Sequence, residues 1–316
     1  MDFENIPDDF RIAIIGSGAI GSYYGARLAS SGRDVHFLLR SDLDHVRENG
    51  ISVTSIHGDF QLSPDQAGFH ATTEEIGPCD LVIIALKTTS NHLLPDLLAP
   101  LVKENTLILT LQNGLGSDEF LASHFDPERI LGGLCFVCIN RTSPGVIDHT
   151  SQGLISIGEF SGSRLARTDE LCELFKAANI PCRVTDSLAA ERWRKLVWNV
   201  PFNGLSIVGG SITTDLILAD PDLTTLARGL MREVVDSARA LGHDLPDSII
   251  DENINKTAPM KSYRPSSLID YMEGREVEVE AIWGEPYRRG LDSGAQVGRL
   301  EAVYRLISAL TSRVSR

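Results

Sequence analysis

Residues 11–40, RIAIIGSGAIGSYYGARLASSGRDVHFLLR, contain the pattern that decides the fold. A short apolar run, RIAII, leads into a turn with Gly16, Gly18 and Gly21, then into a helical periodicity that ends at Gly32, and then into a second apolar run. The spacing G-x-G-x-x-G is a weak signal alone, but between a strand and a helix it is typical of a dinucleotide-binding unit. The stretch therefore predicts the start of an α/β domain that binds a dinucleotide.

Each glycine of this turn has a predicted task. Gly16 allows the tight turn, Gly18 lets a pyrophosphate approach the backbone, and Gly21 permits close packing of helix on strand. The N-terminus of the helix supplies amide groups and a partial positive charge for the phosphates. The alternative is a glycine-rich turn without a ligand. The residues expected to hold the cofactor here are Gly16, Ser17, Gly18, Ala19, Ile20 and Gly21.

The end of the second apolar run distinguishes between cofactors. Proteins that bind NAD usually place an acidic residue there, on the ribose hydroxyls, whereas this chain has Arg40. A guanidinium suits the 2′-phosphate of NADP, because its planar fork can bind a phosphate bidentately. We therefore expect NADPH as the cofactor, although Arg40 could be an ordinary surface residue. Asp42, two residues later, leaves dual use of NAD open.

Further apolar runs continue the α/β pattern. CDLVIIALK (79–87) and NTLILTLQNG (105–114) indicate two more buried strands, and 116–125 indicates a short helix. Continuous apolar strands separated by helices predict a doubly wound parallel sheet that is covered on both faces. Short β runs are expected in 130–160, and a helix in 168–178. Beyond about residue 186 the pattern predicts helices only, at 187–208, 221–241, 246–256, from near Ser267, and at 297–313. We therefore expect two domains, 1–186 and 187–316.

Two strand ends carry polar residues. In open α/β sheets, ligands bind at the carboxyl ends of the strands, and both Lys87 and Asn113 follow such an end. Lys87 could instead be a solvated surface lysine, and Asn113-Gly114 is also a common turn pair. From position alone, neither alternative is favoured.

The composition limits the classes of function. A net charge of −14 argues against general nucleic-acid binding. No apolar run approaches the roughly 20 residues of a membrane span, and the acidic N-terminus lacks the apolar core of a secretory signal, so we expect a cytoplasmic protein without membrane partners. The five cysteines are scattered, and the Cys135-x-x-Cys138 pair lies in an apolar run without a second ligand pair. We expect structural cysteines and no metal site.

The segment Trp193–Ser206, WRKLVWNVPFNGLS, places Lys195, Asn199 and Asn203 at spacings of four. On a helix these three residues form one polar row. The flanking residues are apolar on several sides, which indicates a buried helix whose amine and amides need partners. The alternative is an amphipathic helix with Lys195 and both asparagines at the solvated face.

Several segments in this order resemble the ketopantoate reductases (2-dehydropantoate 2-reductases). They span most of the chain from residue 10 to 290, and the ordered set is specific although the first segment is generic to dinucleotide enzymes. The segments are IGSGAIGSYYGARLASSGRDVHFLLR (15–40), ALKTT (85–89), LQNGLG (111–116), ERWRKLVWNVPFNGLS (191–206) and PSSLIDYMEGREVEVEAIWGE (265–285).

The resemblance implies a Rossmann domain joined to a helical domain like that of 6-phosphogluconate dehydrogenase, with the active site in the cleft between them. It implies NADPH-dependent reduction of 2-ketopantoate to D-pantoate. By matching motifs, Lys195 is the general acid and Glu278 holds the substrate hydroxyl. Asn199, Asn203 and Ser267 contact the substrate, and Lys87 and Asn113 lie at the cofactor, with Asn113 also facing the substrate.

Departures from the family pattern leave alternatives open. Val277 replaces a common threonine, Trp283-Gly284 replaces Asn-Gly, and NGLS replaces NPLT after the lysine. The segment 276–280 alternates like an edge strand with an acidic face, so Glu276 or Glu280 could take the role of Glu278. The rival functions are reduction of another small 2-keto acid and a non-catalytic NADP-binding regulator. The amphipathic helices leave a homodimer open.

Overall fold

The computed structural model describes residues 6–7 and 9–314. Its contacts divide the chain into two compact units. The first, here called the sheet unit, comprises the residues up to Gln112 and Ser117–Leu188, and the second, the helical unit, comprises Asn113–Gly116 and the residues from Ala189 onward. The division at Leu188 lies beside the expected boundary at 186. The four residues Asn113–Gly116 were expected in the first domain and instead pack with the second, because Leu115 joins its apolar core.

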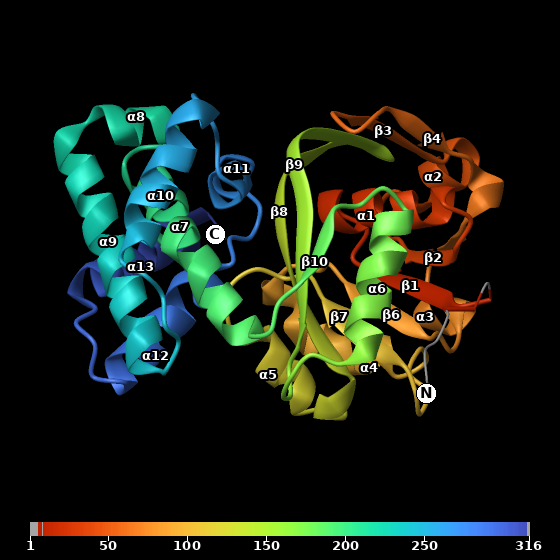
Figure 1. The fold of residues 1–316 in the computed structure, drawn as a ribbon. Coiled ribbons are helices and arrows are strands. Elements are labelled where there is room, and N and C mark those ends of the chain that lie inside the picture. The colour runs from red at the N-terminus through yellow and green to blue at the C-terminus, as the bar shows by residue number, and fades with distance from the viewer. Residues whose placement is uncertain (1–5, 8, 315–316) are drawn as a thin grey trace. The chain divides into compact units, whose positions relative to one another are not determined.

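The sheet unit is built on one mixed sheet (Figure 1). In the described residues its strand order is β4-β3-β9-β8-β7-β6-β1-β2-β5, and β10 pairs with β9. Strands β8, β7, β6, β1, β2 and β5 are mutually parallel, which confirms the predicted doubly wound, Rossmann-type sheet. The strands are β1 (Arg11–Ile15), β2 (Asp34–Leu38), β3 (Ile51–Ser55), β4 (Phe60–Leu62), β5 (Gly68–His70), β6 (Leu81–Ile84), β7 (Leu107–Thr110), β8 (Ile130–Ser143), β9 (Val146–Glu159) and β10 (Cys182–Val184).

Both faces of the central strands are buried, which explains their continuous apolar sequences. In β1, Ile12 and Ile14 belong to one core cluster, while Ala13 and Ile15 belong to the cluster on the opposite face. This alternation is the period of two that a strand imposes on its side chains. The helices of this unit are α1 (Ala19–Ser30), α2 (Leu43–Asn49), α3 (Thr73–Ile76), α4 (Leu94–Leu98), α5 (Ser117–Ala122) and α6 (Ala166–Ala177), with short 3-10 turns η1 (Pro64–Gln66), η2 (Thr88–Leu93) and η3 (Pro127–Arg129).

The prediction of short β runs in 130–160 is wrong. Strands β8 and β9 each span 14 residues and form one long antiparallel hairpin (Figure 1). Three register shifts along the hairpin interrupt its pairing. Such irregularities break the alternation of apolar and polar residues on which a strand is recognised. The hairpin therefore looks fragmented in the sequence although its backbone pairing continues.

The helical unit contains only helices in its described residues, as predicted. Its core gathers side chains from α7, α9, α10, α11, the π-helix and α13, with Trp193 and Trp283 as the largest buried members. Observed bounds lie within two residues of the expected ones for the major helices. The elements are α7 (Leu188–Val208), α8 (Thr214–Ala219), α9 (Pro221–Ala240), α10 (Ser248–Thr257), η4 (Ala258–Met260), α11 (Ser266–Met272), the π-helix η5 (Glu280–Gly284), α12 (Glu285–Asp292) and α13 (Gly298–Val314).

The edge-strand interpretation of 276–280 is wrong. Residues 275–278 are irregular, and Val279 and Glu280 begin a helical stretch that continues as a π-helix and then as α12. π-helical turns are uncommon and are often found beside functional residues. Val277 and Glu278 are both buried, so burial in this segment does not alternate as it would on a half-buried β-strand.

Candidate active site

The glycine turn of the sheet unit has a backbone that only glycine fits at two positions. Gly16 has a φ of 106°, and a Cβ there would lie 2.3 Å from the amide nitrogen of Leu86. At Gly21, a Cβ would lie 2.2 Å from the carbonyl oxygen of Gly16. The first glycine thus lets the turn close against the segment after β6, and the second lets α1 pack against the turn.

Gly18 differs from its two neighbours because it faces open space. A Cβ at Gly18 would meet no described atom within 4 Å. Gly18 is the N-cap of α1, and no side chain accepts a hydrogen bond from the cap region. The Ser17 hydroxyl donates to the carbonyl of Leu38 at 2.9 Å, which ties the turn to the end of β2. An open glycine before amides that no side chain caps fits a pyrophosphate group.

The segment that follows β2 carries one positively charged and one negatively charged side chain, and they differ in exposure. Arg40 is exposed, whereas Asp42 is buried. The Asp42 carboxylate pairs with the guanidinium of Arg141 on β8 and accepts a hydrogen bond from the Ser41 hydroxyl at 2.8 Å. A free Asp42 would leave use of NAD open, but its carboxylate is engaged by Arg141.

The ends of β6 and β7 are joined by a glutamine that sequence reasoning missed. The Gln112 amide nitrogen donates to the Leu86 carbonyl at 2.9 Å and to Asn91 Oδ1 at 2.7 Å. Lys87 follows Leu86 and is half-buried at the start of η2. Only its place before Asn113-Gly114 in the sequence could have drawn attention to Gln112. The contacts show that Gln112 fixes the backbone from which Lys87 projects.

The polar row of α7 lies within a buried helix, as predicted. Asn199 is 8% exposed and Asn203 is 1% exposed, while Lys195 is half-buried. Lys195 Nζ donates to Asn113 Oδ1 at 2.8 Å. The backbone amide of Ser267 donates to Asn203 Oδ1 at 3.0 Å. The helical unit therefore brings together four of the residues expected at the substrate.

Asn199 lies between the two engaged members of the row. Its side-chain amide makes no hydrogen bond to any residue in the part of the chain that the structure describes. A nearly buried amide normally has partners, since leaving it without them is costly. The arrangement therefore suits a ligand that supplies hydrogen-bonding groups to Asn199.

The segment Asn113–Gly116 is held against the π-helix. The Leu115 amide donates to the carbonyl of Ala281 at 2.9 Å. Gly114 has a φ of 76°, and a Cβ there would lie 2.2 Å from the same carbonyl oxygen. Arg192, one turn before Lys195, donates to the Gly114 carbonyl at 3.4 Å. These contacts place Asn113 where it can accept from Lys195.

Trp283 donates a hydrogen bond to α7 one residue before its proline. Pro201 lies inside the helix between Asn199 and Asn203, where it cannot donate a backbone hydrogen bond. The Trp283 indole donates to the carbonyl of Val200 at 3.0 Å. A Cβ at Gly204 would approach the indole nitrogen to 3.0 Å, so glycine leaves room for the ring. Trp283, a departure from the family pattern, thus packs against α7 at the segment that carries the polar row.

Burial distinguishes the three candidate glutamates. Glu276 and Glu280 are exposed, and Glu280 is engaged by Arg288 and by the Tyr304 hydroxyl. Glu278 is 8% exposed. A buried carboxylate beside the π-helix is the better candidate for holding a substrate hydroxyl, because desolvation strengthens its hydrogen bonds.

The cysteines and other potential metal ligands of the described residues form no further candidate site. The five cysteines are buried and reduced, and Cys135 and Cys138 lie on β8. Within residues 6–7 and 9–314, no cluster of three or more His, Cys, Asp or Glu side chains could hold a metal ion. None of the helices described is long and apolar enough to cross a membrane.

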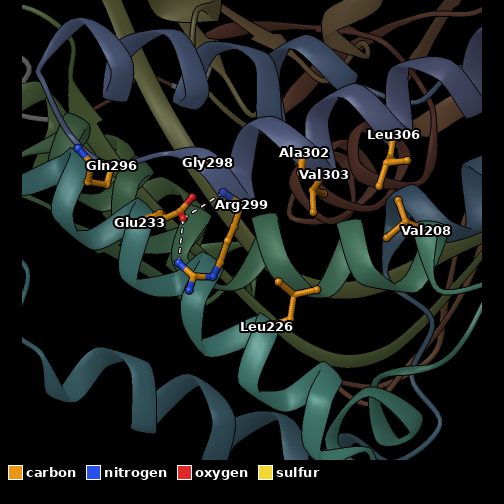
Figure 2. Close-up of a pocket in the computed structure, with 9 residues that line it drawn as sticks. All are labelled: Val208, Leu226, Glu233, Gln296, Gly298, Arg299, Ala302, Val303 and Leu306. Carbon is orange, nitrogen blue, oxygen red and sulfur yellow. Dashed lines mark hydrogen bonds and ion pairs between the residues drawn. The ribbon is translucent and has the colours of Figure 1, made fainter.

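A groove of about 570 Å³ in the helical unit contains none of the predicted site residues (Figure 2). Its lining is mostly apolar, from α7, α9 and α13. Its two charged residues form an ion pair, with the Arg299 guanidinium 3.2 Å from the Glu233 carboxylate. The same carboxylate accepts hydrogen bonds from the backbone amides of Arg299 and Leu300. These contacts cap α13. The groove is therefore a hollow whose charged groups already bind one another, and it is not a candidate reaction site.

Comparison with known proteins gives consistent results over nearly the whole chain. The family model described as "Ketopantoate reductase PanE/ApbA" matches residues 12–162, and its C-terminal counterpart matches residues 187–311. The chain is 42% identical over 308 residues to a 2-dehydropantoate 2-reductase from Nostoc sp., covering 96% of each protein. A crystal structure of 2-dehydropantoate 2-reductase from Geobacter metallireducens matches with a TM-score of 0.92 and 45% identity, over 95% of this chain and 99% of that one. The corresponding structure from Methylococcus capsulatus matches with a TM-score of 0.87 and 33% identity, over 97% and 98%.

Proposed function

The chain belongs to the ketopantoate reductase PanE/ApbA family of oxidoreductases, and from this premise we propose that it reduces 2-ketopantoate to D-pantoate with NADPH. The observation that carries the proposal is the row on α7, in which Lys195 donates to Asn113 while Asn199 and Asn203 lie buried beside it. A ketone reductase needs a proton donor beside amides that orient the substrate, and this row supplies both.

Lys195 is the proposed general acid. The nicotinamide, when bound, supplies a hydride to the ketone carbon. Negative charge then develops on the ketone oxygen, and the Lys195 ammonium donates its proton there to give the hydroxyl of the product. Asn113 accepts a hydrogen bond from Nζ and so limits the directions in which the ammonium can point. A held donor loses little orientational freedom when the substrate binds, which favours reaction.

The remaining polar residues of the helical unit are proposed to hold the substrate. Asn199 offers both a donor and an acceptor without a partner in the described chain. Ser267, 3% exposed, is the proposed ligand of the substrate carboxylate, and Asn203 fixes its backbone. The buried Glu278 carboxylate is the proposed acceptor for the substrate hydroxyl. Asn113, which accepts a hydrogen bond from Lys195, is proposed to face the same substrate.

The sheet unit is proposed to hold the cofactor. The turn Gly16–Gly21 would bind the pyrophosphate through its amides, since Gly18 leaves the space open and α1 lacks a side-chain cap. Arg40 would bind the 2′-phosphate of NADPH, and Lys87 would contact the cofactor further along. Asn113, which belongs to the helical unit, is proposed to contact the cofactor as well. The exposed Arg40 and the engaged Asp42 favour NADPH over NADH.

The test follows NADPH absorbance with 2-ketopantoate and with a panel of branched 2-keto acids. Rapid oxidation with 2-ketopantoate, with much slower oxidation of the other acids, is expected. Turnover only on another 2-keto acid would show that the proposed substrate is wrong and that the proposed reaction, NADPH-dependent ketone reduction, is right. Binding of NADPH without turnover on any acid would contradict the proposal and favour a regulator.

A further inference from the structure

The long β8–β9 hairpin brings a residue from late in the sheet unit to the end of β2. The tip of the hairpin packs on the neighbouring chain segment, where the Ser52 amide donates to the Gly145 carbonyl at 2.8 Å. A Cβ at Gly145, which has a φ of 68°, would lie 2.9 Å from the carbonyl oxygen of Gly50. This close approach fixes the tip beside α2. Arg141, near the end of β8, thereby reaches Asp42, the N-cap of α2.

The Arg141–Asp42 pair is asymmetric. The Asp42 side chain is 7% exposed, whereas that of Arg141 is 40% exposed. Asp42 accepts from the Ser41 hydroxyl as well as from Arg141, so its carboxylate is held in place by two neighbours. A buried carboxylate without its cation would be strongly unfavourable and would seek another positive partner. The nearest in the sequence is Arg40, two residues earlier.

This arrangement bears on which cofactor the end of β2 accepts. An acidic side chain at this place binds a ribose with a free 2′-hydroxyl and repels a 2′-phosphate. Asp42, two residues beyond Arg40, would add a negative charge beside this place if no cation were paired with it. Arg141 cancels its charge, while Arg40 stays exposed and makes no ion pair in the described chain.

We propose that Arg141 is a specificity-determining residue: by neutralising Asp42 it lets the end of β2 accept a 2′-phosphate in preference to a 2′-hydroxyl. The inference rests on the NADPH preference proposed above and assigns it to a pair rather than to Arg40 alone. Arg141 acts through Asp42, so its effect should disappear when Asp42 carries no charge.

The test measures binding of 2′,5′-ADP and of 5′-AMP by isothermal titration calorimetry, without substrate or turnover. Wild type should bind 2′,5′-ADP more tightly. Arg141→Gln should weaken 2′,5′-ADP by about tenfold and change 5′-AMP by less than about twofold, the scale of one uncompensated charge near a partly solvated site. In the double variant Asp42→Asn/Arg141→Gln, the affinity for 2′,5′-ADP should return to within about threefold of wild type, because both charges are gone.

Arg164→Gln is the matched control, since it removes another arginine–aspartate pair of the same unit, that with Asp169 on the surface. It should leave both affinities unchanged. Unchanged 2′,5′-ADP binding in Arg141→Gln, equal loss of both nucleotides, or no recovery in the double variant would each overturn the inference. Wild type without preference for 2′,5′-ADP would instead contradict the proposed NADPH use, and with it the inference. Because the double variant contains no unpaired buried carboxylate, it also guards against misfolding of the single variant.

Discussion

The glycine turn of the sheet unit and the polar row of the helical unit are built in opposite ways. In the turn, Gly16, Gly18 and Gly21 lie within six positions of one another, although Gly16 also closes against Leu86. In the row, Lys195 bonds to Asn113 and Asn203 to Ser267, at separations of 82 and 64 residues. A local motif can be recognised from its spacing in the sequence, whereas a site assembled from distant segments depends on the packing of the whole unit.

The largest effect is expected for Lys195→Ala. Removing the proton donor should lower kcat by about 10²–10³-fold, the range measured when one transition-state donor is lost. NADPH binding should persist, since the turn lies in the other unit. The readout is kcat for 2-ketopantoate beside the dissociation constant for NADPH. Lys256→Ala is the control, because Lys256 is an exposed lysine of the same unit, 3.8 Å from Glu252. Normal turnover by the Lys195→Ala variant would contradict the proposal that Lys195 is the general acid.

The next largest effect separates two glycines of the same turn. In Gly16→Ala the Cβ would meet backbone at 2.3 Å with a φ of 106°, so both folding stability and NADPH affinity should fall, the latter by about tenfold or more. In Gly18→Ala the Cβ meets no described atom within 4 Å, so stability should stay near wild type while NADPH affinity falls. Melting temperature and fluorescence titration measure the two quantities. Equal losses of stability in both variants would contradict the assigned tasks.

A smaller effect separates two asparagines of the row. Asn203→Ala leaves the buried Ser267 amide without its acceptor and should lower the free energy of unfolding by about 1–3 kcal/mol. Asn199→Ala removes a side chain without a described partner, so its stability should change little while KM for 2-ketopantoate rises. Chemical denaturation and steady-state kinetics measure the pair. A stability loss in Asn199→Ala as large as that in Asn203→Ala would show that Asn199 is structural.

The smallest effect is a pH dependence within the sheet unit. Burial lowers the pKa of His149 below its ordinary value of 6.5, and the neighbouring His57 lowers it further. His149 therefore takes up a proton at a lower pH in the folded protein than in the unfolded chain, where it does so near pH 6.5. Its contribution to stability is present above pH 6.5 and is lost as the pH falls toward the lowered pKa of the folded state.

Melting temperatures at pH 7.5, 6.5 and 5.5 test this for wild type and His149→Gln. The variant should be less stable at pH 7.5, because His149 contacts Ser55 and the carbonyls of Ser151 and Gln152. It should lose less stability than wild type on acidification. If the melting temperatures of the two proteins fell equally with pH, His149 would not be the source of the pH dependence.

The same contrast between local and assembled features explains what the sequence could predict. The doubly wound sheet and the main helices follow from periodicity and from glycine punctuation, both local signals. The row on α7 was visible as a spacing, and Asn113 as a polar residue after a strand end, but Ser267 came only from family resemblance. Among the glutamates, burial favours Glu278, and spacing could not supply that information. The continuous β8–β9 hairpin was missed because its register shifts disrupt the strand pattern, and the Arg141–Asp42 pair was missed with it.

The most direct test of the proposed reaction uses NADPH with deuterium at both C4 positions of the nicotinamide, together with wild-type protein and 2-ketopantoate. Mass spectrometry of the product should show pantoate with one deuterium at C2, formed in equal amount to NADP⁺, because the hydride goes to the ketone carbon. Unlabelled pantoate, or NADPH oxidation without pantoate, would contradict reduction of the ketone by this protein.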